Sequence, residues 1–121
     1  MIKGLRTMIY HVSDFANTKA SYGRVLEREP CFEQPFYVGY EVGGFELGLL
    51  PDGRPGPGGT VAYWGVADAA AAVKKLEALG AVICDPLQEV GEGIRVATVT
   101  DPFENTFGVI ENPNFSVAKV Q

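Results

Sequence analysis

Apolar and polar residues alternate along several short segments of the chain, which is the pattern of half-buried β-strands. The clearest of these segments covers residues 5–12, where Met8, Tyr10 and Val12 would share one face. Further extended segments are predicted at residues 29–33, 35–42 and 45–50, with Gly43-Gly44 as the hairpin turn between the last two.

A helix is predicted between the first and second of these segments, at residues 14–26, because apolar side chains recur there at helical spacing. Ser13 or Asp14 can cap it, since a short polar side chain accepts hydrogen bonds from the free backbone N–H groups of the first turn. The first half of the chain therefore predicts the order βαβββ.

The second half repeats this order. Asp68 stands where Asp14 stands, between a strand and a helix, and Gly48 and Gly108 occupy equivalent places in the last strand of each half. The predicted elements are a strand at 60–66, a helix at 68–79 stopped by Gly80, and strands at 81–85, 93–100 and 106–111. The sequence thus predicts an α+β fold of two tandem βαβββ modules.

The 121 residues are enough for one domain with a hydrophobic core. We expect a single domain, 1–121, in which module one covers about 4–51 and module two about 60–113. Residues 51–59 are too rich in proline and glycine for regular structure and would form a linker, and 114–121 would be a C-terminal tail.

The charge pattern argues against nucleic acid as a partner. Ten basic and fifteen acidic residues give a net charge of -5, and the basic ones are scattered rather than clustered. The chain lacks an apolar run long enough for a membrane helix, and its first residues lack the apolar core of a signal peptide, so we expect a cytoplasmic protein without membrane contact. Cys31 and Cys84 are then expected to be buried thiols rather than a disulfide.

At this point the chain resembles the vicinal-oxygen-chelate superfamily, which includes glyoxalases, bleomycin-resistance proteins and extradiol dioxygenases. The segments that carry the resemblance are YHVSDFANTKASYGRVL, WGVADAAAAVKKLEALG and the final DPFENTFGVIENP. Glu104 departs from the family pattern, which usually has glycine there. The resemblance implies an eight-stranded, partly open barrel around a pocket.

The resemblance also implies where a metal would bind, because metal-using members take one ligand from each first strand and one from each last strand. Those positions in this chain are Thr7, Gly48, Val61 and Gly108. Valine and glycine have no side chain that can bind a divalent ion, and threonine is a poor ligand. We therefore expect no metal site of the usual kind and no cofactor.

Strand alternation from these four positions predicts which side chains face the pocket. Most of them are aromatic or aliphatic with a few polar groups, which is the usual composition of a small-molecule site. The predicted ligand-binding residues are Thr7, Ile9, His11, Phe36, Val38, Tyr40, Glu46, Gly48, Leu50, Val61, Tyr63, Val96, Thr98, Gly108 and Ile110.

Glu46 and His11 are the weak candidates for catalysis. An inward carboxylate at Glu46 could pair with a cation or act as a base, or could reach solvent through an open mouth. His11, the only histidine, stands where glyoxalase-like members often carry a basic residue that contacts substrate, and the alternative is a structural or solvated side chain. Gly48 and Gly108 would either leave room for a ligand or ease strand curvature.

Two functions compete, and a regulatory or interaction domain is a third possibility that the sequence leaves open. The first is a binding protein that holds a small organic molecule in the pocket without a metal. The second is an enzyme, a lyase, isomerase or dioxygenase, that uses Glu46 and His11 or an unconventional metal site. We expect a homodimer, because open module edges need covering. The identity of the ligand, and whether the modules pair within one chain or between chains, do not follow from the sequence.

Overall fold

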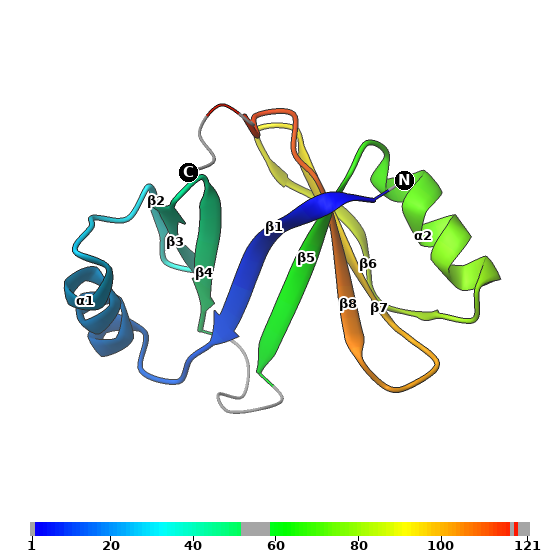
Figure 1. Cartoon of the computed structure of the whole chain (residues 1–121). Coiled ribbons are helices and arrows are strands. Elements are labelled where there is room, and N and C mark those ends of the chain that lie inside the picture. The colour runs from blue at the N-terminus through cyan, green and yellow to red at the C-terminus, as the bar shows by residue number, and fades with distance from the viewer. Residues whose placement is uncertain (1, 52–58, 117, 119–121) are drawn as a thin grey trace. The chain divides into compact units, whose positions relative to one another are not determined.

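The computed structural model describes residues 2–51, 59–116 and 118 (Figure 1). Its elements are β1 (Ile2–His11), α1 (Phe15–Leu26), β2 (Phe32–Gln34), β3 (Tyr37–Val42), β4 (Phe45–Leu50), β5 (Thr60–Val66), α2 (Ala69–Ala78), β6 (Val82–Gly91), β7 (Ile94–Thr100) and β8 (Thr106–Glu111). The predicted α+β class with two successive βαβββ modules is confirmed. Residues 52–58 of the predicted linker lie outside the described residues.

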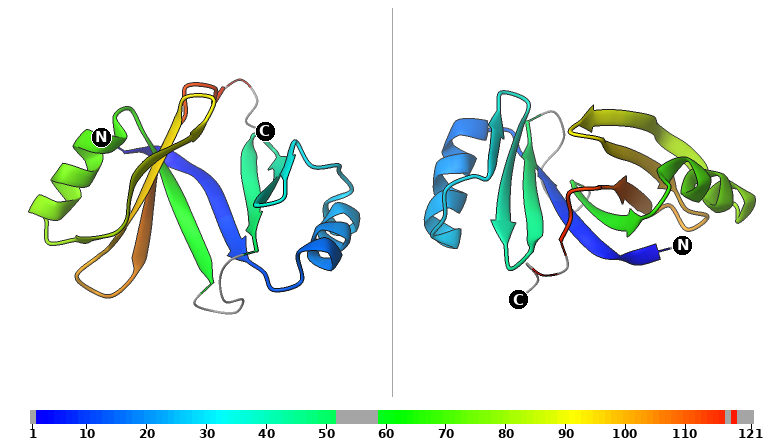
Figure 2. Two further views of the ribbon diagram at one scale, coloured as in Figure 1. Left: turned by 180° about the vertical axis from the view of Figure 1, so that it is seen from behind. Right: turned by 90° about the horizontal axis from the view of Figure 1, so that it is seen from above.

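Two compact units make up the structure, and β1 contributes to both. Of the described residues, the α1 unit holds 7–51, 59–61, 116 and 118, and the α2 unit holds 2–6 and 62–115. Hydrogen bonds join the strands in the order β2-β3-β4-β1-β5-β8-β7-β6. Figure 2 shows that each helix lies against strands of its own unit.

The core of the α1 unit lies between α1 and one face of its strands. Helix α1 begins after Asp14, whose side chain accepts a hydrogen bond from the Asn17 amide at 3.2 Å, so the predicted cap is confirmed. In its sheet, β4 pairs in parallel with β1 and antiparallel with β3. The buried residues are Val12, Val38, Tyr40 and Leu49, and Tyr10, Phe15, Tyr22, Leu26 and Val42 pack against them.

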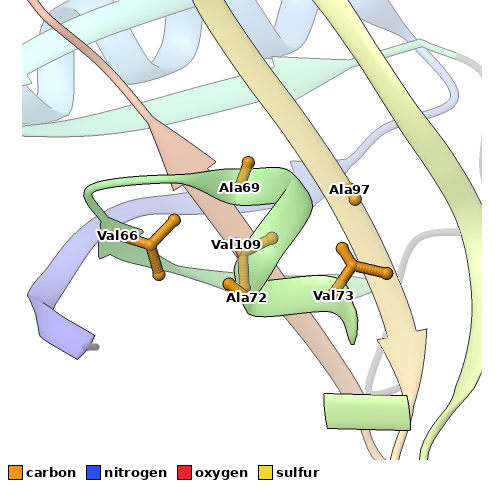
Figure 3. Packing of buried hydrophobic residues seen from close by; sticks show 6 residues of the cluster. All are labelled: Val66, Ala69, Ala72, Val73, Ala97 and Val109. Carbon is orange, nitrogen blue, oxygen red and sulfur yellow. The ribbon is translucent and has the colours of Figure 1, made fainter. Parts of the chain in front are cut away.

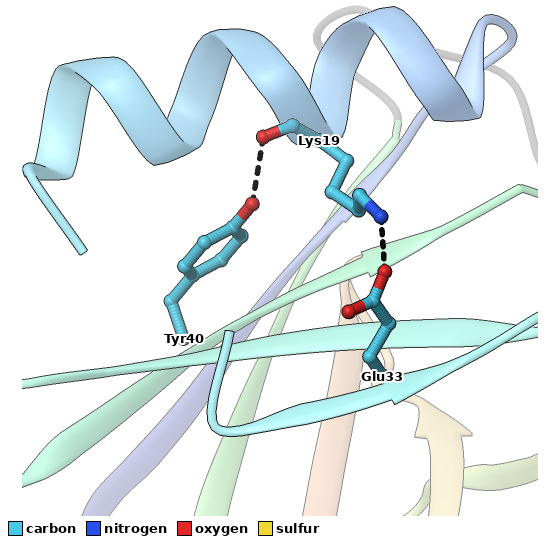
Figure 4. A network of polar contacts seen from close by, with 3 residues as sticks. All are labelled: Lys19, Glu33 and Tyr40. Carbon is cyan, nitrogen blue, oxygen red and sulfur yellow. Dashed lines mark hydrogen bonds and ion pairs between the residues drawn. The ribbon is translucent and has the colours of Figure 1, made fainter. Parts of the chain in front are cut away.

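Polar contacts fasten α1 to the strands beneath it (Figure 4). The Tyr40 hydroxyl donates a hydrogen bond of 2.7 Å to the Lys19 carbonyl oxygen of α1, and the Lys19 ammonium forms an ion pair with Glu33 of β2. Tyr40 belongs to the core and its hydrogen bond is part-buried, whereas the ion pair is exposed and contributes little to stability.

The α2 unit repeats this plan. Strand β8 pairs in parallel with β5 and antiparallel with β7, and β6 pairs with β7. The Asp68 side chain accepts from the Ala71 amide at 3.1 Å, and Gly80 ends the helix region with φ +105°. The Glu111 Oε1 atom of β8 accepts from the Ala69 amide at 2.9 Å, which joins the sheet to the helix N-terminus. Figure 3 shows the buried cluster of Val66, Ala69, Ala72, Val73, Ala97 and Val109.

The turns follow the sequence signals closely. Gly43 and Gly44 have φ of +62° and +96°, as a two-residue hairpin turn requires. Asp101 Oδ1 accepts from the Phe103 and Asn105 amides, each at 2.8 Å, and so fixes the turn before β8. Glu104 has φ +71°, the glycine-type conformation expected at that place, with a strain of about 1 kcal/mol.

The two cysteines are free, as predicted, but both are exposed, so the expectation that they are buried is wrong. Cys31 precedes the short strand β2, and Cys84 lies on β6, which is the last strand in the order of pairing. Neither of the two described helices has the length and apolarity that a membrane-spanning segment needs.

Candidate functional site

Two glycines lie directly opposite each other on β3 and β4, and their pairing determines which side chains share a face of the α1 unit. Gly39 pairs with Gly48, and Val38 pairs with Leu49. Directly paired residues point to the same side of a sheet. Because Val38 and Leu49 belong to the core beneath α1, Gly39 and Gly48 lie on the face away from that helix.

The predicted orientation of Val38 and Tyr40 toward the pocket is therefore wrong. Their exposed fractions are 1% and 0%, and both pack under α1. Phe36 was expected on the same face, but it precedes β3 and is 61% exposed. A register change of one residue moves every side chain of a strand to the other face, which is the origin of the error.

The Tyr37 ring and the Glu46 carboxyl lie over this pair of glycines. A Cβ atom at Gly48 would be 2.6 Å from Tyr37 Cε1 and 2.7 Å from Ile9 Cδ1, and one at Gly39 would be 3.0 Å from Glu46 Oε2. The Tyr37 hydroxyl donates a hydrogen bond to Glu46 Oε2. The glycines are thus needed because they leave the space that these side chains fill.

Burial raises the pKa of the Glu46 carboxyl above its ordinary value, and the hydrogen bond from Tyr37 partly opposes that rise because it stabilises the charged form. Glu46 is half-buried. Cys31 is exposed as a residue, but partial desolvation of its thiol, followed by the nearby Glu46 charge, raises the pKa of that thiol. This pairing of a desolvated carboxyl with a phenol can hold a ligand by hydrogen bonds or take a proton from it.

Strand β1 brings a second row of predicted residues beside Glu46 and Gly48. Thr7 pairs with Glu46 and Ile9 pairs with Gly48, and the two β1 side chains are buried. His11 pairs with half-buried Leu50 at the end of the strand. This face therefore joins Thr7, Ile9, Glu46, Gly48 and Tyr37.

His11 is not brought to Glu46. Four residues of strand separate Thr7, the partner of Glu46, from His11, which is about 13 Å. The His11 Nδ1 atom lies 2.7 Å from the Gly59 carbonyl oxygen, so Nδ1 carries the hydrogen and donates it. The ring is held at the end of β1, and the predicted joint action of Glu46 and His11 has no geometric support.

In the α2 unit, the glycine equivalent to Gly48 also lies under a tyrosine. A Cβ at Gly108 would be 2.7 Å from Tyr63 Cδ1. Gly108 pairs directly with Tyr63 of β5 and with Thr98 of β7, and Val96 pairs with Ile110 on the same face. These residues therefore lie on one face of the sheet, and their role in binding a ligand stays a prediction. Val61, the other predicted residue of β5, is half-buried.

A β-bulge adds a carboxylate to this face of the α2 unit. The pairing of β6 with β7 shifts between Ile83 and Asp85, and bulges of this kind redirect side chains. The buried Thr98 hydroxyl donates to Asp85 Oδ2 at 2.7 Å. Burial, followed by the charge of Asp85 and then Cys84, raises the pKa of the Tyr63 phenol.

The residues at the four family metal positions do not fit a divalent ion. Thr7 and Val61 offer no strong donor, and the side-chain space at Gly48 and Gly108 is occupied by Tyr37 and Tyr63. Within the ranges that the structure describes, no cluster of three or more histidine, cysteine, aspartate or glutamate residues could hold a metal. Of the two alternatives for these glycines, room for a ligand has no support at the Cβ positions, because the Tyr37 and Tyr63 rings lie there.

Sequence reasoning missed Tyr37 and Asp85. Tyr37 follows from the hairpin, because a two-residue turn at Gly43-Gly44 fixes the register of β3 against β4 and places odd-numbered residues of β3 with Gly48. Asp85 had no comparable signal, since a bulge of one residue leaves no pattern in the sequence.

Comparisons with known proteins agree on the fold. No protein-family model and no curated protein matches the sequence. Among solved structures, a methylmalonyl-CoA epimerase in complex with methylmalonyl-CoA and NH4+ is similar with a TM-score of 0.73 at 14% identity, covering 96% of this chain and 99% of that one. A glyoxalase/bleomycin resistance protein/dioxygenase superfamily member from Vibrio splendidus 12B01 has a TM-score of 0.68 at 19% identity, covering 88% and 97%.

A third similar structure is described as an NAD-dependent benzaldehyde dehydrogenase from Legionella pneumophila, with a TM-score of 0.67 at 15% identity over 88% of this chain and 97% of that one. The chain therefore has the fold of the glyoxalase, bleomycin-resistance and dioxygenase superfamily, as its sequence predicted. The activities named for these structures differ, so the fold does not decide the function.

Replacing Gly48 with alanine should destabilise the protein by about 1–3 kcal/mol, because the added Cβ would overlap Tyr37 and Ile9. The measurement is the free energy of unfolding in urea for G48A, Y37A and the double variant. We expect the double variant to lose less than the sum of the two single losses, since removing the ring relieves the overlap. Strict additivity would contradict this packing.

Replacing Tyr37 with phenylalanine should raise the pKa of Glu46 further, because the hydroxyl hydrogen bond favours the charged carboxylate. The titration is followed by the ¹³C shift of the Glu46 carboxyl, and Y63F in the α2 unit is the matched control that should change nothing. An unchanged or lower pKa in Y37F would refute the assignment.

The same raised pKa gives a pH dependence to stability. The folded protein holds the Glu46 proton more tightly than the unfolded chain does, so stability relative to E46Q should fall as pH rises above about 4.3 and level off beyond the folded pKa.

Proposed function

We propose that this protein binds a small organic molecule on the face of the α1 unit that carries Tyr37 and Glu46, and that it does so without a divalent metal. The observation that supports this is the Glu46 carboxyl, half-buried and held by the Tyr37 hydroxyl over Gly39 and Gly48. Removing a carboxyl from water costs free energy unless hydrogen bonds or an opposite charge compensate for the lost hydration.

The chemistry of this face defines the kind of ligand. Glu46 Oε2 accepts from Tyr37, while Oε1 has no hydrogen-bond partner within the described part of the chain. A ligand with an O–H or N–H group can donate to Oε1, and the half-buried Tyr37 ring is an apolar neighbour of this carboxyl. We therefore expect a small apolar or aromatic molecule with one hydroxyl or amino group.

The binding test uses phenol and benzylamine as probes. The ¹³C shift of the Glu46 carboxyl is the readout in the wild type, and the Gly48 backbone amide is the readout that the wild type and E46Q share. Saturable binding that shifts Glu46, and an affinity at least about tenfold lower in E46Q, are the expected results, since a polar site rejects a partner that leaves a group unpaired. E77Q, on the exposed side of α2, is the matched control. Absence of a shift with both probes would contradict the proposal.

Metal is measured on the same material. Elemental analysis of the full chain purified without added metal should show far less than one equivalent of any divalent ion. One equivalent that resists a chelator would overturn the metal-free part of the proposal.

A second candidate is proton transfer by Glu46. Its raised pKa favours this, because a base works best when its pKa lies nearer the working pH. Since one of the similar structures is a methylmalonyl-CoA epimerase, methylmalonyl-CoA is a reasonable first substrate to try.

If Glu46 transfers protons, the wild type should exchange the α-hydrogen of methylmalonyl-CoA for deuterium in D₂O, and E46Q should be at least about a hundredfold slower. An E46Q variant that exchanges at the wild-type rate would remove Glu46 from this role. The E77Q variant again serves as the matched control.

The homodimer and the cytoplasmic location remain predictions. An observation that supports a dimer is the ten-residue strand β6 at one end of the pairing order, with Val82 and Val90 exposed by 67% and 46%. Exposed apolar edge strands are commonly covered by a second copy.

A further inference from the structure

Arg6, at the point where β1 leaves the α2 unit, is a cation that forms no ion pair with any residue that the structure describes. We propose that Arg6 binds an anion, and that the anion is the carboxylate or phosphate group of a small molecule. This inference goes beyond the proposed function, because it rests on residues of the α2 unit and not on Tyr37 or Glu46.

Three neighbours form a slot around the Arg6 side chain. The guanidinium carbon lies 3.8 Å from the centre of the Phe115 ring. A Cβ at Gly65 would be 2.8 Å from Arg6 Nε, and one at Gly4 would be 3.1 Å from Nη1. The two glycines make space for the guanidinium, and the aromatic face holds it by a cation–π contact.

Few of the hydrogen-bond donors of Arg6 are used. A guanidinium has five N–H donors, and the hydrogen bond found for Arg6 in the described residues is a long one, from Nη1 to the Leu5 carbonyl oxygen at 3.3 Å. Carboxylates are plentiful, since the chain has fifteen acidic residues against ten basic ones. Even so, no ion pair to Arg6 forms within the part of the chain that the structure describes.

Arg95 provides the contrast within the same unit. Its Nη1 atom lies 3.5 Å from Glu111 Oε1, so its charge is balanced by the protein itself. Arg6 has an aromatic ring where Arg95 has a carboxylate. A ring stabilises the face of the guanidinium and leaves its edge, with the N–H groups, available for a planar or tetrahedral oxyanion.

The slot also lowers the entropy cost of binding. A free arginine side chain must lose rotamer freedom when it grips an anion, whereas packing against Phe115 and Gly65 has already removed part of that freedom. An arginine that served only to attach Phe115 would need the cation–π contact alone, and a lysine would supply that contact too. Recognition of a carboxylate or phosphate uses the planar fork of N–H donors, which arginine has and lysine lacks.

The test follows the Nε–Hε NMR signal of Arg6 in the ¹⁵N-labelled full chain during titration with sodium phosphate, sodium acetate and sodium chloride at matched ionic strength. We expect a saturable shift of the Arg6 signal with phosphate or acetate and none with chloride. Saturation by phosphate alone would assign a phosphate group, and saturation by acetate alone a carboxylate. The Arg95 signal is the internal control and should not saturate.

Two variants separate a built site from general charge, with the Gly65 backbone amide as the readout. R6K keeps the charge but not the fork, and should bind at least about tenfold more weakly. F115L keeps Arg6 and removes the ring, and should bind several-fold more weakly. Parallel, non-saturating shifts of Arg6 and Arg95 in all three salts, or undiminished binding by R6K, would overturn the proposal.

Discussion

The direct pairing of Gly39 with Gly48 is the constraint on which the candidate site of the α1 unit depends. Side chains on one face of a sheet fill the space above it, so two paired positions without a Cβ leave a hollow. Tyr37 and Ile9 fill that hollow at Gly48, and Glu46 lies against Gly39. The burial that raises the pKa of Glu46 follows from this packing, and so does its contact with the tyrosine hydroxyl.

In the α2 unit a tyrosine also packs over a glycine of the last strand, but it comes from a different neighbouring strand. Gly108 lies under Tyr63, which comes from the parallel neighbour β5, whereas the tyrosine over Gly48 comes from the antiparallel neighbour β3. Its carboxylate, Asp85, reaches the face through a bulge and is anchored by Thr98. The repeat that is evident in the sequence therefore preserves the glycine and the fold of each module, while the polar groups beside the glycine differ.

The elements of this fold could be predicted because each has a local signal. Both aspartate caps and the Gly43-Gly44 turn act over a few residues, and the structure shows all of them. The register of β3 could also have been predicted from the sequence. A two-residue turn pairs Val42 with Phe45 and so places Val38 on the face opposite to Gly48. The bulge at Asp85 and the slot around Arg6 depend on contacts between distant residues, for which one sequence gives no local pattern.

The tyrosine over Gly48 also bears on the metal position that the resemblance implies at this glycine. The family's carboxylate ligand would have to enter at Gly48, where the space belongs to Tyr37 and Ile9. A glutamate there would clash before it could reach an ion, so residues 37 and 48 must change together. The carboxyl on this face is that of Glu46, two residues earlier in β4, and it accepts a hydrogen bond from the Tyr37 hydroxyl. Glu46 and Tyr37 are therefore the hydrogen-bonded polar pair that this packing leaves on the face of the α1 unit away from the helix.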